Sequence, residues 1–287
     1  MISIIIPTYN RANIINRTIM SVLAQTEKDL EVIIIDDGST DNTCNIIKNL
    51  NDNRIQYFYK KNGGAASARN LGLSKAQGKY ITFLDSDDCW PERYLEVMLT
   101  SLQINDEFGA AYSPITIIYP DGSRITSYKK PEGKNGWITL DLFKNNFIWT
   151  PAILFKASVL KDFYFDENLV VSEDSDAWLR LSLCTKFLFV PEIEAFVNIS
   201  SDSLCKKTTN PYYRLHSLER FYFKLNGYKI IPYYIARRKL SHVCRRIGKS
   251  EKSQKTARIL YKKAIKYWPL DIRLYFDLIK TYHVRTQ

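Results

Sequence analysis

Residues 79–88 read KYITFLDSDD, a short apolar run that ends abruptly in a cluster of acidic side chains. The run predicts a buried β-strand over 79–84, because it is short and rich in aromatic and β-branched residues. A second run, EVIIIDDGS at 31–39, predicts a strand over 31–36 that also ends in aspartates. Open α/β sheets bind their ligands at the carboxyl ends of the strands. The two acidic strand ends therefore favour a functional site over a random acidic surface.

The segments around these two strands alternate between strand-like and helix-like patterns. Further strands are expected over 3–7 and 54–59, and helices over 13–25, 42–49, 64–76 and 92–105. This alternation is typical of an α/β domain with a mostly parallel sheet.

Beyond residue 105 the pattern becomes less regular. Strands are expected over 109–113, 115–119 and 152–156, a polar loop over 122–135, and a basic helical region with a hairpin over 257–279. We find no convincing internal repeat.

The composition excludes several classes of protein. With 287 residues and 45% hydrophobic content, the chain is long and apolar enough to bury a core, which excludes a disordered chain. Its longest apolar stretches are far shorter than the roughly 20 residues that span a bilayer. Its five cysteines are scattered and form no CxxC pair, which argues against a disulfide framework or a zinc site. The first residues resemble a strand and not a signal peptide, so we expect a cytoplasmic protein.

The net charge of +11 is distributed unevenly along the chain. Residues 210–287 contain 19 Lys and Arg against 4 Asp and Glu, whereas residues 1–209 contain 22 against 26. Such a basic extension suits an anionic membrane surface. Nucleic acid is the competing partner, but no nucleic-acid-binding motif accompanies the charge and none is expected to bind. A solvated basic face is the third interpretation.

The triplet Asp85-Ser86-Asp87 carries the first chemical signal. Carboxylates one residue apart at a strand end can bind a hard divalent cation such as Mg²⁺ or Mn²⁺, together with substrate phosphates. Alone the triplet is a weak signal, because acidic turns on protein surfaces produce it by chance.

Three further motifs precede the triplet in a fixed order. They are IIIPTYNR at 4–11, VIIIDDGSTD at 32–41 and NGGAASARN at 62–70, followed by FLDSDD at 83–88. With this set the sequence resembles the family 2 glycosyltransferases, which are inverting enzymes of the GT-A fold. The resemblance implies a Rossmann-like mixed, mostly parallel sheet flanked by helices. We expect a catalytic domain over 1–209, with a nucleotide-sugar half over 1–105 and an acceptor half over 106–209. The charge and the helical pattern of the remaining residues predict a basic α-helical extension over 210–287.

The resemblance also assigns roles to individual residues. It implies that the nucleotide sugar is bound by Pro7, Thr8, Tyr9, Arg11, Asp36, Asp37, Gly64, Arg69, Asp85 and Ser86. The divalent metal, Mn²⁺ or Mg²⁺, would be bound by Asp87 and Asp85. By chemistry alone, Asp37 can accept a hydrogen bond from a pyrimidine imide. Arg69 suits either a diphosphate or a structural salt bridge to Asp36 or Asp85.

A second acidic segment, SEDSDAWLRL at 172–181, suits the acceptor side of the reaction. Inverting transfer needs a general base for the acceptor hydroxyl. The resemblance implies that Asp174 is this base and Glu173 an orienting neighbour, with Asp176 as the rival. The alternative from spacing alone is that Ser172 or Asp174 caps a helix.

One motif of the family is missing. Many relatives carry Arg-x-His-x-x-Ser about two dozen residues further on, and the corresponding segment here, 198–203, reads NISSDS. The three histidines, His216, His242 and His283, all lie in the basic extension. The resemblance still implies a metal-dependent inverting transfer from a nucleotide sugar, expected to be a UDP-sugar, to a glycan or lipid-linked glycan in surface polysaccharide synthesis. A catalytically degenerate binding protein is the alternative, and a nucleotidyltransferase ranks last.

Overall fold

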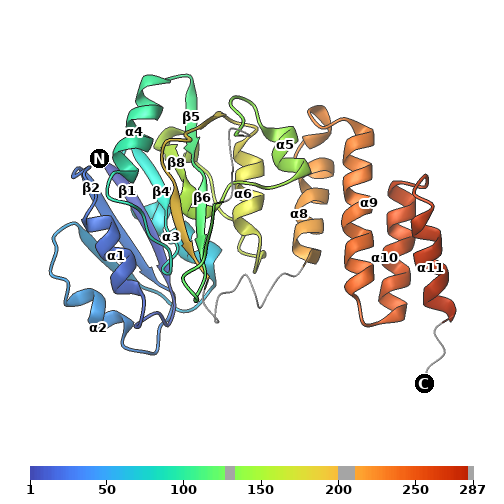
Figure 1. Cartoon of the computed structure of the whole chain (residues 1–287), viewed down its shortest axis with the longest axis horizontal. Helices are drawn as coiled ribbons and strands as arrows, with labels where there is room; N and C mark the ends of the chain where they lie inside the picture. Colours follow the sequence, from blue (N-terminus) through green and yellow to red (C-terminus); the bar gives the residue numbers. More distant parts are fainter. Residues whose placement is uncertain (127–132, 200–210, 284–287) are drawn as a thin grey trace. The chain divides into compact units, whose positions relative to one another are not determined.

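The computed structural model describes residues 1–126, 133–199 and 211–283 (Figure 1). The chain divides into two compact units, one formed by 1–138 and 147–208 and the other by 139–146 and 209–287. The predicted boundary between residues 209 and 210 lies outside the described residues. Residues 139–146, which the sequence assigns to the acceptor half, group with the C-terminal helices.

The first unit is built on a seven-stranded sheet with the order β3-β2-β1-β4-β8-β5-β9. Its strands are β1 (Ile2–Thr8), β2 (Leu30–Asp36), β3 (Ile55–Tyr59), β4 (Tyr80–Phe83), β5 (Phe108–Tyr112), β8 (Ile153–Lys156) and β9 (Lys186–Phe189). The first four strands pair in parallel, as does β5 with β9, whereas β8 is antiparallel to both of its neighbours. The predicted mixed, mostly parallel sheet is confirmed.

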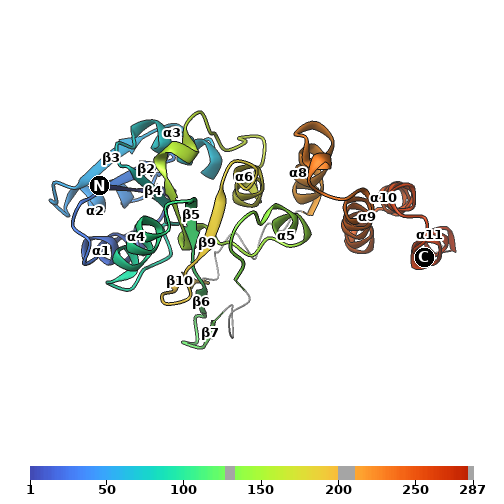
Figure 2. The ribbon, with the colours of Figure 1, turned by 90° about the horizontal axis from the view of Figure 1, so that it is seen from above.

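Helices cover both faces of this sheet. They are α1 (Ile15–Leu23), α2 (Thr43–Lys48), α3 (Ala65–Lys75), α4 (Tyr94–Ile104) and α6 (Glu173–Leu181). In Figure 2, α3 lies on one face of the sheet and α1 and α4 on the other. Every residue of β1 and β2 is buried, which is the pattern of central parallel strands covered on both faces.

Close packing of α3 on β1 depends on a glycine. A Cβ atom at Gly72 would lie 2.4 Å from Cγ2 of Ile5, which is fully buried in β1. We expect Gly72→Ala to lower the free energy of unfolding by about 1–3 kcal/mol, because overpacking outweighs the gain in helix propensity. Urea denaturation measures the change, with Ser74→Ala on the exposed side of α3 as the control. A Gly72→Ala protein as stable as the native one would contradict this close approach.

A smaller sheet contains β6 (Ile115–Ile118), β7 (Arg124–Thr126) and β10 (Ala195–Asn198), in the order β10-β6-β7. The sequence predicts a loop over 122–135, and this is wrong for Arg124–Thr126. These three residues form an exposed edge strand paired with β6, so no buried alternation marks them. Residues 127–132 of the predicted loop lie outside the described residues.

The second unit is helical. Its elements are α5 (Thr139–Lys144), α8 (Pro211–Lys224), η3 (Gly227–Lys229), α9 (Tyr233–Ser250), α10 (Gln254–Tyr267) and α11 (Arg273–His283). Phe143 of α5 packs against Phe221 and Tyr222 of α8. The predicted hairpin is confirmed as α10 and α11. Within the described part of the chain, no helix combines the length and the apolar character needed to span a bilayer.

Candidate active site

The carboxyl ends of the first four strands form one edge of the large sheet. Thr8 at the end of β1 lies opposite Asp36 at the end of β2, and β4 runs parallel to β1 on its other side. The chain leaves β4 at Leu84, whose N–H donates to the Ile5 carbonyl, and continues directly into Asp85. The expectation that the acidic turns share an edge of the sheet is confirmed.

The carboxylates of Asp36 and Asp37 are hydrogen-bonded to neighbouring groups at this edge of the sheet. The Asp36 carboxylate accepts hydrogen bonds from the Ser39 N–H (2.7 Å) and the Tyr57 hydroxyl (2.6 Å). The Asp37 carboxylate accepts from the N–H groups of Gly63 (2.9 Å) and Gly64 (2.7 Å), and Lys60 lies 2.6 Å from it. Both carboxylates are therefore satisfied by the protein. A base contact by Asp37 stays a prediction, and it would compete with these partners.

The loop after β4 is held by α1 and β10. Thr18 donates to the Ser86 carbonyl, Arg17 donates to the Asp87 carbonyl, and the buried Asp88 carboxylate accepts from the Asn198 N–H. Burial and the neighbouring carboxylates raise the pKa of Asp87, and the pKa of Asp88 lies well above its ordinary value for the same reasons. The loop thus concentrates negative charge where little solvent screens it.

Arg69 joins the two acidic centres that the sequence singles out. Its guanidinium donates to Asp85 (2.7 Å) and to Glu173 (2.6 Å), which lies 104 residues further along the chain. Arg69 itself is 3% exposed. Burial alone would lower its pKa, but Asp85 and Glu173 outweigh burial and raise the pKa. The predicted salt bridge between Arg69 and Asp85 is confirmed. The second ion pair, with Glu173, was not predicted from the sequence.

Asp174 lies beside this cluster on the first turn of α6. Its carboxylate accepts hydrogen bonds from the Ser175 N–H (2.6 Å) and from the Thr150 hydroxyl (3.3 Å). Its charge contributes to the raised pKa of both Arg69 and Glu173, so it is electrostatically part of the same site. Asp174 is half-buried, which leaves it open to a substrate hydroxyl.

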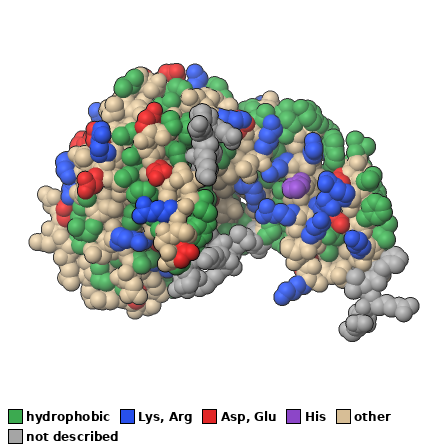
Figure 3. Space-filling model, in the orientation of Figure 1, with side chains coloured by type: hydrophobic (Ala, Val, Ile, Leu, Met, Phe, Trp, Pro, Cys, Tyr) green, Lys and Arg blue, Asp and Glu red, His purple; other side chains and the backbone are tan. Residues whose placement is uncertain are grey.

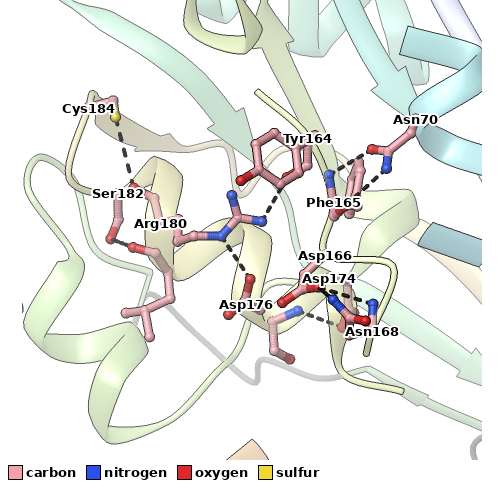
Figure 4. A network of polar contacts seen from close by, with 12 residues as sticks. Asn70, Tyr164, Phe165, Asp166, Asn168, Asp174, Asp176, Arg180, Ser182 and Cys184 are labelled. Carbon is pink, nitrogen blue, oxygen red and sulfur yellow. Dashed lines mark hydrogen bonds and ion pairs between the residues drawn. The ribbon is translucent and has the colours of Figure 1, made fainter. Parts of the chain in front are cut away.

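Two alternative interpretations of residues 172–181, Asp176 as the base and Ser172 as a helix cap, do not fit the geometry. Asp176 is 1% exposed, and Arg180 donates to it at 2.7 Å while also bonding the Tyr164 carbonyl at 2.9 Å (Figure 4). Asp176 therefore holds α6 in place and is poorly accessible to an acceptor. The capping interpretation is also wrong for Ser172, because this N-cap residue is left-handed (φ 65°) and makes no side-chain cap hydrogen bond.

The remaining predicted residues lie around the same edge. Pro7 and Thr8 close β1, and the buried Thr8 hydroxyl has no hydrogen-bond partner among the described residues. Tyr9 is half-exposed directly after them, and Arg11 is close enough to lower the pKa of Asp87. Gly64 is the N-cap residue of α3, with φ 88°, and the buried Ser86 accepts the Thr18 hydrogen bond through its carbonyl.

The first unit matches the sequence model of glycosyl transferase family 2 over residues 3–164. The chain belongs to this family. An uncharacterized glycosyltransferase of Rickettsia bellii is 38% identical over 182 residues, which cover 63% of this chain and 26% of that protein. Chondroitin synthase of Pasteurella multocida is 38% identical over 196 residues, covering 67% of this chain and 20% of the synthase. The chain therefore spans about a quarter of the length of these curated relatives.

Solved structures of glycosyltransferases share the fold of the chain. Staphylococcus aureus TarS 1–349 in complex with UDP-GlcNAc has a TM-score of 0.63 at 16% identity, covering 98% of this chain and 89% of TarS. A mannosyltransferase from Pyrobaculum calidifontis in complex with GDP-Man and Mn²⁺ has a TM-score of 0.60 at 17% identity, with 98% and 85% covered. At these identities the likeness establishes the fold, which is GT-A as predicted.

Three residues that contact the candidate site lie outside the sequence motifs. Lys60 follows β3 at the same sheet edge as Asp37, so the strand-end argument that marks the aspartates also applies to it. Arg17 lies in the first turn of α1, and nothing in its spacing marks it. Thr150 begins a short 3₁₀ helix (η1, Thr150–Ala152) far from any motif, and only the fold brings it to Asp174.

The acidic loop suits a divalent cation. Within the described residues no group of three or more His, Cys, Asp and Glu side chains is arranged to hold a metal. Mg²⁺ and similar ions commonly use one or two carboxylates and complete their shell with substrate phosphates and water. Asp85 and Asp87 supply two carboxylates, and burial with like charge raises the pKa of Asp87, a penalty that a divalent cation would relieve. The residues present therefore fit the predicted metal.

Proposed function

We propose that the chain is a metal-dependent inverting glycosyltransferase that moves a sugar from a UDP-sugar to a glycan or lipid-linked glycan. The observation that carries this proposal is the ion-pair bridge through Arg69. It joins Asp85, on the loop predicted to bind the donor diphosphate, to Glu173, next to the predicted base Asp174. The bridge supports the proposal because the proposed donor site and the proposed base would then lie in one cluster, as direct transfer between two substrates requires.

The residues of the cluster have distinct roles in this proposal. The acceptor hydroxyl attacks the anomeric carbon of the donor sugar while the bond from that carbon to the diphosphate breaks on the opposite side. Asp174 takes the hydroxyl proton, and Thr150 and the Ser175 N–H fix the orientation of its carboxylate. Glu173 does not take part in proton transfer, because its carboxylate is held by Arg69.

Asp85 and Asp87 would hold the divalent cation, which when bound supplies positive charge to the leaving diphosphate. Arg11 and Arg17 lie close enough to act on Asp87 and add positive charge at the same end of the site. One structural neighbour is in complex with GDP-Man and Mn²⁺ and another with UDP-GlcNAc, which supports this class of donor. The names chondroitin synthase and hyaluronan synthase among the relatives support a polysaccharide acceptor.

The proposal also covers where the enzyme works. We place it at the cytoplasmic face of a membrane, held there through the basic helices of the second unit.

A donor hydrolysis assay tests the central part of the proposal. The protein is incubated with a panel of UDP- and GDP-sugars and Mn²⁺, and release of the nucleoside diphosphate is measured. We expect turnover of at least one donor, reduced about a hundredfold or more by EDTA and restored by Mn²⁺. Asp87→Asn should reproduce the effect of EDTA, whereas Asp106→Asn, which changes an exposed aspartate, should not. Absence of both turnover and binding for every donor would refute the proposal.

A further inference from the structure

The last helix presents most of its apolar side chains to solvent. The apolar residues of the second hairpin segment include Ile272, Leu274, Tyr275, Leu278 and Ile279, and among these only Leu274 is fully buried. The exposed side carries Ile272 (68% exposed), Phe276 (61%), Tyr282, Ile279 and Tyr275. Their spacing of three and four residues forms one stripe along α11. We call these five residues the apolar stripe.

Helix α9 presents a row of cations. Arg238, His242, Arg246 and Lys249 are exposed and recur at three- and four-residue spacing, so they lie on one side of the helix. No described acidic side chain forms an ion pair with Arg238, Arg246 or Lys249. Figure 3 shows Lys and Arg side chains gathered around a histidine on this unit. We call these four residues the basic row.

A further cation, Lys239, lies next to the basic row. It is half-buried, and its Nζ donates to the Lys144 carbonyl. Burial, followed by the charges of Arg214 and Arg246, lowers the pKa of Lys239 to about 8. Several positive charges therefore lie close together in this part of the unit, which costs stability unless an anion binds there.

The basic row and the apolar stripe adjoin each other. Helix α10 packs against both α9 and α11, and Arg245 of α9 forms an ion pair of 2.7 Å with Asp277 of α11, so the two helices approach each other at this point. Burial and then the cations Lys239, Arg246, Arg245 and Arg273 lower the pKa of His242, which places Arg273 of α11 near the row. Arg273 and Lys280 are seven residues apart and line one edge of the stripe.

We propose that the basic row and the apolar stripe together form a docking face for an anionic lipid bilayer. Cations next to exposed aliphatic and aromatic side chains are the combination that binds membrane interfaces, where charge attracts the headgroups and the apolar side chains enter below them. The inference rests on the proposed function, since it names the partner that would bring the enzyme to a lipid-linked acceptor.

Charge favours a bilayer over the other occupants of such a face. Residues 211–283 contain 18 Lys and Arg against 4 Asp and Glu, so two copies of this unit would repel each other. Nucleic acid would satisfy the cations, but it offers nothing to the aliphatic side chains of Ile272 and Ile279.

Sedimentation with lipid vesicles tests the docking face. The whole chain is mixed with vesicles of phosphatidylcholine alone or with 30% phosphatidylserine, in the absence of donor. We expect binding at least about tenfold tighter to the anionic vesicles, weakened by salt. Arg238→Glu with Arg246→Glu should lower that affinity about tenfold or more, and Ile272→Ser with Phe276→Ser by a similar factor.

Matched controls lie on the first unit. Lys79→Glu with Arg124→Glu changes two exposed cations there, and Ile104→Ser changes an apolar residue that is 76% exposed. Neither should alter vesicle binding. All four variants change exposed side chains, so their thermal unfolding midpoints should match that of the native chain.

Three outcomes would overturn the inference. The first is equal binding to both kinds of vesicle, and the second is binding that the docking-face variants leave unchanged. The third is a dimer in sedimentation velocity, or an RNA complex, that those variants disrupt while vesicle binding stays as it was. Donor hydrolysis measured without lipid tests the proposed function separately. A protein that hydrolyses donor and ignores vesicles refutes only the docking face.

Discussion

Asp174→Asn is expected to lower sugar transfer by about 10²–10⁴-fold while changing the affinity for UDP by less than about twofold. The amide of asparagine keeps the shape of the side chain and can still accept from Thr150, but it cannot take a proton from the acceptor hydroxyl. In the proposed function the donor is held around Asp85 and Asp87, so its binding should not depend on this proton acceptor. Transfer is measured with a glycan acceptor and UDP binding by calorimetry.

Asp176→Asn is the matched control, two residues further along α6. Asp176 is buried against Arg180, so we expect this variant to unfold at lower denaturant while its transfer rate per folded molecule stays near the native value. A large loss of transfer in Asp176→Asn with native activity in Asp174→Asn would assign the base to Asp176. A loss of UDP binding in Asp174→Asn would place this residue in the donor site.

The sequence predicts well which strand ends meet at one edge of the sheet, because each of these positions is marked by the strand that precedes it. Each acidic turn directly follows a strand whose apolar run is unmistakable, and parallel pairing brings the strand ends to one edge. The pairing of the strands is therefore enough to bring Thr8, Asp36 and Asp85 to the same edge. The resemblance to family 2 adds the roles, and the fold confirms the arrangement.

The acceptor half depends on contacts between distant segments. Glu173 contacts Arg69, which lies 104 residues earlier in the chain. Thr150 contacts Asp174 from a 3₁₀ turn that the periodicity of the sequence does not predict. Asp174 and Asp176 are alike in sequence, and they differ only because Arg180 lies one turn beyond Asp176 on a buried side of α6. Helical spacing also fails to say which side of α11 packs, since its apolar residues are spread over both the inner and the outer side.

Arg69→Leu is expected to lower the free energy of unfolding by about 3–5 kcal/mol, the largest effect on stability that we predict. Leucine fills part of the space but leaves Glu173 and Asp85 without their shared cation, and Glu173 is only 9% exposed. Arg69→Lys should recover part of the loss, because one ammonium can pair with either carboxylate but lacks the fork that reaches both. Guanidinium denaturation measures both variants.

The double variant Arg69→Leu with Glu173→Gln shows whether unpaired charge is the cause. Glutamine carries no charge, so the double variant should be more stable than Arg69→Leu alone. The pH dependence gives a second check. Burial raises the pKa of Glu173 and Arg69 opposes that rise, so without Arg69 the folded state holds the Glu173 proton more tightly than the unfolded state. The penalty of Arg69→Leu should therefore be smallest at acidic pH and grow as the pH rises from the ordinary carboxyl pKa through that of folded Glu173. A penalty that is independent of pH and unchanged in the double variant would mean that Arg69 stabilises the fold through its packing on Phe165 and not through its charge.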